Sequence, residues 1–284
     1  MTYAWPNHWP TLSAPLPAPK LRVLSLGAGV QSTTLALAAS RGDVGPMPDC
    51  AIFADTQWEP KRVRDHLDWL KGQLRFPVYE VTAGSIRDAI TARTNTTGGR
   101  FAAVPWFIVN PDGSHGMGRR QCTKEYKLAP IAKHIRALLG KPGRSYIAPD
   151  SVEVWVGIST DEIERMKPAK QRFIVNRWPL IEAGMSRAEC ERWLAERQFS
   201  APKSSCIGCP FHSNAMWRDM RDNHPDEWAD ACEADRLLRA DGPAKGMRRL
   251  EFMHPSRVPL CEAPIDEDDR QLGFALECEG MCGV

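Results

Sequence analysis

The sequence predicts an α/β fold: a twisted parallel sheet flanked by helices, followed by a helical, cysteine-bearing C-terminal part. Short apolar runs alternate with longer segments of helical pattern over roughly the first 180 residues, which is the order of a chain that builds a parallel sheet. Beyond that point the strand pattern ends and helical segments surround a C-x-x-C. We therefore expect a surface arm at 1–20, an α/β domain at 21–180 and a helical part at 181–284.

Each expected element has its own signal. Four apolar runs have the composition of buried parallel strands: residues 21–26, 50–55, 77–82 and 152–158. Four segments between or before them have a helical pattern: residues 32–41, 60–74, 85–93 and 125–139. In the C-terminal part, Ser186 and Glu189 form a capping box at the start of a helix. Two further helical patterns follow, at residues 214–221 and 225–240.

The composition limits the class of protein. The chain has 284 residues and a net charge of +2, so it can bury a sizeable core and neither demands nor excludes nucleic acid or small anions as partners. Its apolar runs are far shorter than the roughly 18 to 20 residues of a membrane-spanning helix. The Pro- and Trp-rich start lacks the features of a secretory signal. We therefore expect a cytoplasmic protein, whose nine cysteines are reduced, catalytic or metal-bound.

A glycine-bearing turn joins the first expected strand to the first expected helix, in VLSLGAGVQSTTLALAAS at 23–40. Gly27 and Gly29 let the backbone approach a phosphate, and the helix start beside Ser32 and Thr33 offers N–H and hydroxyl donors. The turn is neither a G-x-G-x-x-G nor a Walker A loop, since it has no third glycine and no G-K-[ST]. On this stretch alone, a phosphate-binding turn and a purely geometric turn are both open.

Four motifs, each after an expected strand or before an expected helix, resemble those of the pyrophosphate-loop (PP-loop) ATP pyrophosphatases and phosphoadenosine phosphosulfate (PAPS) reductases. They are GAGVQST at 27–33, FADTQWEP at 53–60, GRRQCTKEYKLAPI at 118–131 and VGISTDEIERM at 156–166. The resemblance covers about residues 21–172. It implies a Rossmann-like sheet that binds an adenine nucleotide, either ATP with Mg²⁺ or a sulfonucleotide.

The resemblance also implies which residues bind the nucleotide. The expected contacts are Ser25, Gly27, Gly29, Gln31, Ser32 and Thr33 in the turn, and Asp55 and Thr56 after the second strand. Gln31 departs from the family, which has an aspartate there, and a neutral amide cannot neutralise Mg²⁺ as well. Asp55 and Asp161 are the alternative carboxylates.

Two basic runs lie within or directly after the last two of these motifs: Arg119, Arg120, Lys124 and Lys127, then Arg165, Lys167, Lys170 and Arg172. Each run is either a solvated face or part of a clamp on a triphosphate. We favour the clamp for Arg119, Lys124 and Arg165, with Lys127 beside them, and expect Arg119, Lys124 and Asp161 to be catalytic. Asp161 and Glu162 could position Arg165 or Mg²⁺, or cap the helix that they precede.

The cysteines offer a metal or cluster site. Cys206 and Cys209 form a C-x-x-C, and zinc would need two further ligands, for which Cys122, Cys278, Cys282, His212 and His254 are candidates. The resemblance implies instead a [4Fe–4S] cluster on Cys122, Cys206, Cys209 and Cys282, with Cys278 in reserve. A three-cysteine cluster with one open iron is the alternative. We expect Cys50, Cys190, Cys232 and Cys261 to be small apolar residues in the interior.

Three functions fit this set of features. The first is an ATP-dependent sulfur transferase that adenylylates tRNA, DNA or a small molecule and receives sulfur from a donor such as a cysteine desulfurase. The second is a PAPS or adenylyl sulfate reductase. The third, from another class, is a zinc-stapled nucleic-acid-binding module with an inactive loop, which the near-neutral charge and the lack of zinc-finger spacing disfavour.

Overall fold

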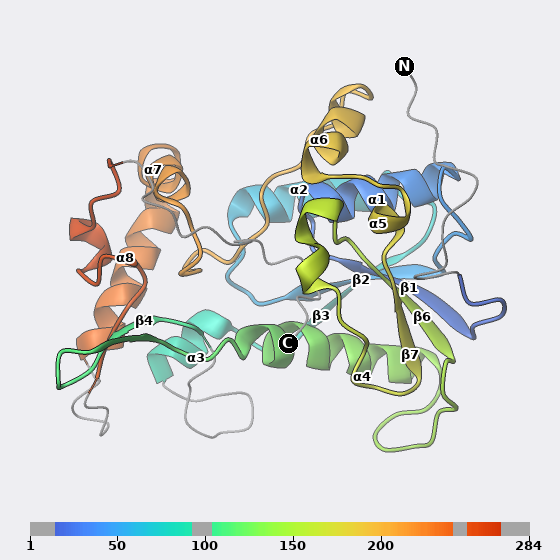
Figure 1. Ribbon diagram of the computed structural model, residues 1–284, viewed down its shortest axis with the longest axis horizontal. Helices are drawn as coiled ribbons and strands as arrows, with labels where there is room; N and C mark the ends of the chain where they lie inside the picture. The colour runs from blue at the N-terminus through green and yellow to red at the C-terminus, as the bar shows by residue number, and fades with distance from the viewer. Residues whose placement is uncertain (1–14, 93–103, 241–248, 268–284) are drawn as a thin grey trace.

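The computed structural model describes residues 15–92, 104–240 and 249–267 of the chain (Figure 1). At its centre is a five-stranded parallel sheet in the order β3-β2-β1-β6-β7. The strands are β1 (Leu21–Leu26), β2 (Cys50–Asp55), β3 (Val78–Thr82), β6 (Val152–Val156) and β7 (Ile174–Arg177). The predicted parallel α/β sheet and its four predicted strands are therefore confirmed, and β7 is an edge strand that the sequence pattern did not reveal.

The strand order reverses between β1 and β6. From β1 the chain winds outward through β2 to β3, and it then returns to β6 on the other side of β1. Leu24 of β1 therefore lies opposite Ala51 of β2 and Trp155 of β6. In open α/β sheets of this Rossmann-like kind, ligands bind at the carboxyl ends of the strands where the order reverses. The turn at 27–29 follows β1 at that point.

Helices cover both faces of the sheet (Figure 1). One face carries α1 (Val30–Arg41), α2 (Lys61–Lys71), α5 (Pro179–Glu182) and α6 (Arg187–Ala195), and the other carries α4 (Ala129–Leu138). Alternate strand residues face the two layers: Leu24 packs in the cluster that contains Leu35 of α1, whereas Val23 packs in the cluster that contains Ile131 of α4. The apolar runs are continuous because both faces are buried.

A second, antiparallel sheet lies beside the first, in the order β5-β4-β8. It consists of β4 (Phe107–Val109), β5 (His115–Met117) and β8 (Leu250–Phe252). These strands have three residues each, too short to show an alternating pattern, and the expectation that strands end near residue 180 is wrong at β8. β8 pairs with β4, and α6 packs on α1, so contacts cross the boundary that was predicted near residue 180. The division into two domains stays a prediction.

The remaining helices are close to their predicted positions. They are α3 (Ile86–Ala92), α7 (Asn214–Asn223) and α8 (Pro225–Ala240), with short turns η2 (Thr160–Arg165) and η3 (Leu260–Glu262). The helix predicted at 125–139 begins instead with a π-helical turn, η1 (Thr123–Leu128). The capping box is confirmed, since Ser186 and Glu189 exchange backbone-to-side-chain hydrogen bonds. Within the described residues, no helix is both long and apolar enough to cross a membrane.

The end of the predicted arm is tied to the sheet by a buried carboxylate. The Leu16 N–H donates to Glu153 Oε2, and Arg22 Nη2 donates to the Leu16 carbonyl at 2.7 Å. Glu153 is only 1% exposed, and it also accepts a hydrogen bond from Trp155 Nε1 at 2.7 Å. A buried carboxylate needs such partners, so this network holds the chain in place as it enters β1.

Candidate functional site

The glycine turn lies at the carboxyl end of β1, and the side chain of Ser32 bridges its backbone N–H groups. Ser32 Oγ accepts hydrogen bonds from the N–H groups of Gly27 and Gly29, each at 3.2 Å. Ala28, between the two glycines, has a left-handed φ of 57°, a conformation that glycine adopts more readily. Ser25 Oγ is buried and has no hydrogen-bond partner among the described residues. The turn thus combines donors that converge on one point with a buried hydroxyl that an incoming ligand can use.

Gln31 connects this turn to η2, which follows β6. Its Nε2 donates to Glu162 Oε2 at 3.3 Å and to Ser159 Oγ at 3.4 Å, while its Oε1 accepts from Arg187 Nη1 at 3.3 Å. Glu162 also pairs with Arg165. An amide can donate and accept at once, whereas a carboxylate at position 31 would face the carboxylate of Glu162. The glutamine at position 31 therefore has a local physical reason.

The two predicted alternative carboxylates already have protein partners. Asp55 pairs with Arg64 Nη1 at 3.0 Å and accepts from the Gln57 N–H at 2.7 Å. Asp161 Oδ1 accepts a hydrogen bond from the N–H of Arg187 at 3.1 Å. Asp161 therefore stabilises the start of α6, which is distant in the sequence, and does not cap η2, to which it belongs. The carboxylate in contact with the glycine-turn segment is Glu162, which the sequence analysis had offered only as a positioning residue.

His66 of α2 is a site residue that sequence reasoning missed. Its Nε2 lies 2.9 Å from Thr33 Oγ1, in the first turn of α1. Burial lowers the pKa of His66 to about 4, so the ring is neutral at physiological pH. In the sequence, His66 is one residue of an amphipathic helix, and nothing marks it as facing the turn.

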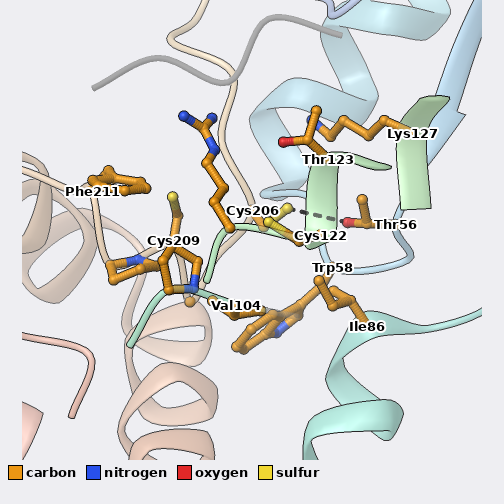
Figure 2. Close-up of a pocket in the computed structure, with 14 residues that line it drawn as sticks. Thr56, Trp58, Ile86, Val104, Cys122, Thr123, Lys127, Cys206, Cys209 and Phe211 are labelled. Atoms are coloured by element: carbon orange, nitrogen blue, oxygen red, sulfur yellow. Dashed lines mark hydrogen bonds between the residues drawn. The ribbon is translucent and has the colours of Figure 1, made fainter. Parts of the chain in front are cut away.

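The predicted cluster cysteines Cys122, Cys206 and Cys209 line one pocket (Figure 2). Cys122 precedes η1, and the other two belong to the loop after α6. Thr56, at the end of β2, places its Oγ1 3.3 Å from Cys206 Sγ. In Figure 2, Cys206 and Cys122 lie on the Thr56 side of the pocket, and Cys209 lies toward Phe211. The structure therefore brings together three thiols that are 84 and 3 positions apart in the chain.

The C-x-x-C loop is fitted to the indole of Trp58. The Ile207 N–H donates to the Trp58 carbonyl at 2.8 Å, and the Cys209 N–H donates to the Cys206 carbonyl at 3.1 Å. A Cβ added to Gly208 would lie 2.0 Å from a ring carbon of Trp58. The glycine inside the motif is thus required by the close approach of the backbone to this ring.

Polar and cationic groups edge the same pocket. Thr123 is fully buried, and its Oγ1 has no hydrogen-bond partner among the described residues. Lys127 and Arg120 line the pocket as well, and the Arg120 guanidinium lies 5.2 Å from the centre of the Phe211 ring. The Thr56 hydroxyl also donates a hydrogen bond to Glu59 Oε2 at 2.8 Å. Burial raises the pKa of Glu59, while the Lys127 charge and the Thr56 hydrogen bond partly oppose the rise.

A site for a single metal ion is not formed by the residues that the structure describes: no three His, Cys, Asp or Glu side chains among them are arranged around one ion. The proposed fourth ligands, Cys278 and Cys282, lie outside the described residues. The candidate histidines have other contacts, because His212 Nε2 lies 2.7 Å from Ser205 Oγ and His254 Nε2 lies 2.9 Å from Asn214 Oδ1.

The other cysteines follow the prediction in part. Cys190 and Cys50 are buried, and burial, assisted by the charge of Asp49, raises the pKa of Cys50 to about 12. Burial also raises the pKa of Cys232 to about 12. Cys261 is exposed, so its prediction as an interior residue is wrong. It belongs to η3, a short surface turn.

The basic residues divide between two places. Arg120 and Lys127 line the cysteine pocket, whereas Lys124, Arg165, Lys167 and Lys170 line a groove on the α4 side of the sheet. Arg119 and Arg172 are exposed and line neither. Of the predicted clamp, Lys124 and Arg165 are therefore brought to one groove, and Arg119 is not.

Comparison with known proteins gives likenesses among solved structures alone. No protein-family model matches the sequence, and no curated protein matches it either. Among solved structures, the chain is similar to the crystal structure of phosphoadenylyl-sulfate (PAPS) reductase from Candida auris in a phosphate complex. The two chains are 13% identical, the similarity covers 65% of this chain and 76% of that chain, and the TM-score is 0.41. The assignment of the parallel α/β fold rests on the strand order and register of this chain itself.

Proposed function

We propose that the chain is an ATP-dependent sulfur transferase of the PP-loop type, in which an iron–sulfur cluster is held beside the nucleotide. The observation that carries the proposal is the shared pocket of Cys122, Cys206 and Cys209 at the end of β2, next to the strand-order reversal. Nothing in the sequence spacing requires these thiols to meet. Thiolates from separate segments favour iron–sulfur or zinc over hard cations.

The chemistry of the pocket supports a cluster. A cluster spreads its thiolate ligands over several irons, and the three cysteines share one pocket. Lys127 and Arg120 at its edge favour the deprotonated thiols. We expect Cys282 to be the fourth ligand, with Cys278 or an open iron as alternatives. Such a cluster would supply redox-active iron with affinity for sulfide.

The nucleotide is expected at the glycine turn. Its phosphates would take the N–H donors of Gly27 and Gly29 when the Ser32 hydroxyl turns from these groups and donates to a phosphate oxygen, and Ser25 Oγ would gain the partner that it lacks. Lys124 and Arg165 would neutralise phosphate charge from the α4 side. Mg²⁺ would be held mainly by the phosphates, with Glu162 as the carboxylate joined to the turn through Gln31.

The proposed reaction has two displacements. An acceptor oxygen attacks the α-phosphorus of ATP, the bond from that phosphorus to the bridging oxygen breaks, and pyrophosphate leaves. A nucleophilic sulfur then attacks the acceptor atom that bears the adenylyl group, the bond from this atom to oxygen breaks, and AMP leaves with the electron pair. The chain's part is to position both phosphate ends and to keep water from the pocket, whose walls include Trp58, Ile86 and Val104.

Calorimetry on the anaerobically purified protein tests the nucleotide part. ATP should bind, and Ser32→Ala should weaken binding by about 1 to 3 kcal/mol because it removes a hydroxyl placed for a charge-assisted hydrogen bond. The matched control is Ser145→Ala, since the hydroxyl of this exposed serine donates to the Pro142 carbonyl of its own turn. Equal ATP affinity in the Ser32 variant and wild type would contradict the proposal. Tighter binding of PAPS or adenylyl sulfate than of ATP would favour the reductase.

A further inference from the structure

Two cysteines outside the candidate site line one surface hollow between α8 and η3. Cys232 lies on α8 and Cys261 lies in η3, and both are free thiols in the structure. The α8 wall of the hollow consists of residues three or four positions apart, which share one face of a helix: Ala229, Cys232, Glu233 and Arg236. Cys261 belongs to the wall that η3 forms. The fold therefore brings together two thiols that are 29 positions apart in the chain.

A buried aspartate holds η3 against α8. Asp235, one turn after Cys232 and 1% exposed, accepts a hydrogen bond at 2.9 Å from the N–H of Leu260, which precedes Cys261. Its other carboxylate oxygen accepts a hydrogen bond at 2.9 Å from the N–H of Met253, just after β8. Because the backbone beside Cys261 is fixed one helical turn from Cys232, the two thiols stay near each other in the folded protein.

The two thiols differ in their access to solvent. Cys261 is exposed, whereas Cys232 is half-buried. Burial raises the pKa of Cys232 to about 12, and the charges of Cys261 and Asp235 contribute to the rise. A solute therefore reaches Cys261 first. Conversion of Cys261 to a neutral mixed disulfide would remove one of the charges that oppose deprotonation of Cys232, which then becomes the better nucleophile.

We propose that Cys232 and Cys261 form a redox-sensitive modification site, which small disulfides of the glutathione class oxidise to an intramolecular disulfide that fastens η3 to α8. The Cys261 thiolate attacks one sulfur of the small disulfide, the bond between its two sulfurs breaks, and one small thiolate leaves and takes up a proton. The Cys232 thiolate then attacks the Cys261 sulfur, and the second small thiol leaves in the same way. Together the two protein thiols lose two electrons and two protons, which the small disulfide gains.

The disulfide would act on a helix that also contacts the cysteine pocket. Asp230, two positions before Cys232 on α8, accepts a hydrogen bond from the indole N–H of Trp58, which lines that pocket. A cross-link over 29 positions restricts mainly the unfolded chain, so the oxidised protein should be the more stable form. The site is separate from the proposed nucleotide and cluster sites, and its test does not depend on them.

Peptide mapping of the full-length protein tests the pair directly. The protein is equilibrated anaerobically with rising ratios of oxidised to reduced glutathione, the remaining thiols are alkylated, and trypsin digestion follows without reduction. Each of the two cysteines lies alone in a tryptic peptide, residues 222–236 and residues 258–270. We expect these two peptides to become linked before buried Cys50 and Cys190 react, and to separate again with dithiothreitol. Two unlinked peptides at every ratio would overturn the proposal, and so would glutathione that stays on Cys261 without a link to Cys232.

Two serine variants separate the roles of the thiols. Cys232→Ser should accumulate the mixed disulfide of Cys261 with glutathione, whereas Cys261→Ser should leave Cys232 unmodified. Cys190→Ser, the buried control, should form the link as wild type does. Oxidation should raise the Tm of wild type by several degrees and leave the Tm of both serine variants unchanged. Equal Tm values for linked and reduced wild type would overturn the fastening of η3 to α8.

Discussion

At the scale of single residues, the hydrogen bond from Gln31 Nε2 to Glu162 Oε2 connects the first turn of α1 to a buried carboxylate. The Gln31 amide also contacts Ser159, just before η2, and Arg187, at the start of α6. The sequence shows a glutamine at position 31, but it does not show the carboxylate beside it.

The isosteric change Gln31→Glu should destabilise the protein. It would place a second buried carboxylate 3.3 Å from Glu162 and remove the donor between them, at a cost of about 2 kcal/mol. The swap Gln31→Glu with Glu162→Gln restores one donor and one charge, so it should recover most of the loss. Urea unfolding of the four proteins measures the coupling. Additive effects of the two changes would contradict this description of the pair.

His66 gives a pH dependence with a definite sign. Its pKa is about 4 in the folded protein and near the usual 6.5 in the unfolded chain. Between these two pH values, the unfolded chain binds a proton at His66 and the folded protein does not, so the unfolded state is favoured as the pH falls. Stability should be level above about pH 6.5 and fall as the pH drops toward 4. His66→Gln should reduce the loss between pH 7 and 4.5 by about 2 kcal/mol.

The control for the histidine is His115→Gln. His115 is exposed on β5, so its replacement should leave the stability of the protein nearly unchanged. Chemical unfolding of wild type and of each variant at about pH 7 and about pH 4.5 gives the free energies of unfolding to be compared. An acid loss in His66→Gln as large as that of wild type would mean that this ring is not held neutral by burial.

At the scale of elements, the C-x-x-C loop depends on the surface of Trp58. Gly208→Ala would place a Cβ 2.0 Å from the indole, so the loop or the ring must move. We expect a loss of about 1 to 3 kcal/mol in stability, the usual cost of overpacking, together with weaker metal retention. Gly116→Ala is the matched control, because its Cβ would meet Ile108 at an ordinary 3.9 Å. A Gly208 variant with wild-type stability and iron content would refute the dependence.

The elements that the sequence predicted are those in which burial determines the pattern of apolar residues. β1, β2 and β6 are largely buried and so have continuous apolar runs, whereas β3 is a partly buried edge strand. The start of α6 followed from its capping box. β4, β5 and β8 were not predicted, because strands of three residues are too short to show a pattern of their own. The pairing of β4 with β8 depends on a segment that is distant in the chain. The same holds for the candidate site: motif residues were predicted, whereas the contact of His66 with Thr33 depends on neighbours that only the fold supplies.

At the scale of the whole molecule, the cysteine pocket joins the two parts of the chain. Cys122 comes from the segment before α4, and Cys206 and Cys209 come from the loop that leads to α7. Trp58, from the loop after β2, packs in the same apolar cluster as Trp217 of α7 and Leu238 of α8. A cluster bound at this pocket would fasten the helical part to the parallel sheet, since metal-binding energy becomes folding energy.

Iron and acid-labile sulfide analysis of the anaerobically reconstituted protein, with its visible spectrum, is the most direct test of this account. Wild type should hold one [4Fe–4S] cluster with absorbance near roughly 400 nm, the thiolate-ligated cluster type named above. Cys206→Ser should be colourless and more sensitive to protease beyond about residue 200, whereas the buried control Cys190→Ser should keep iron and colour. Wild type that holds one tight zinc and no iron, or a Cys206 variant that retains the full cluster, would contradict it.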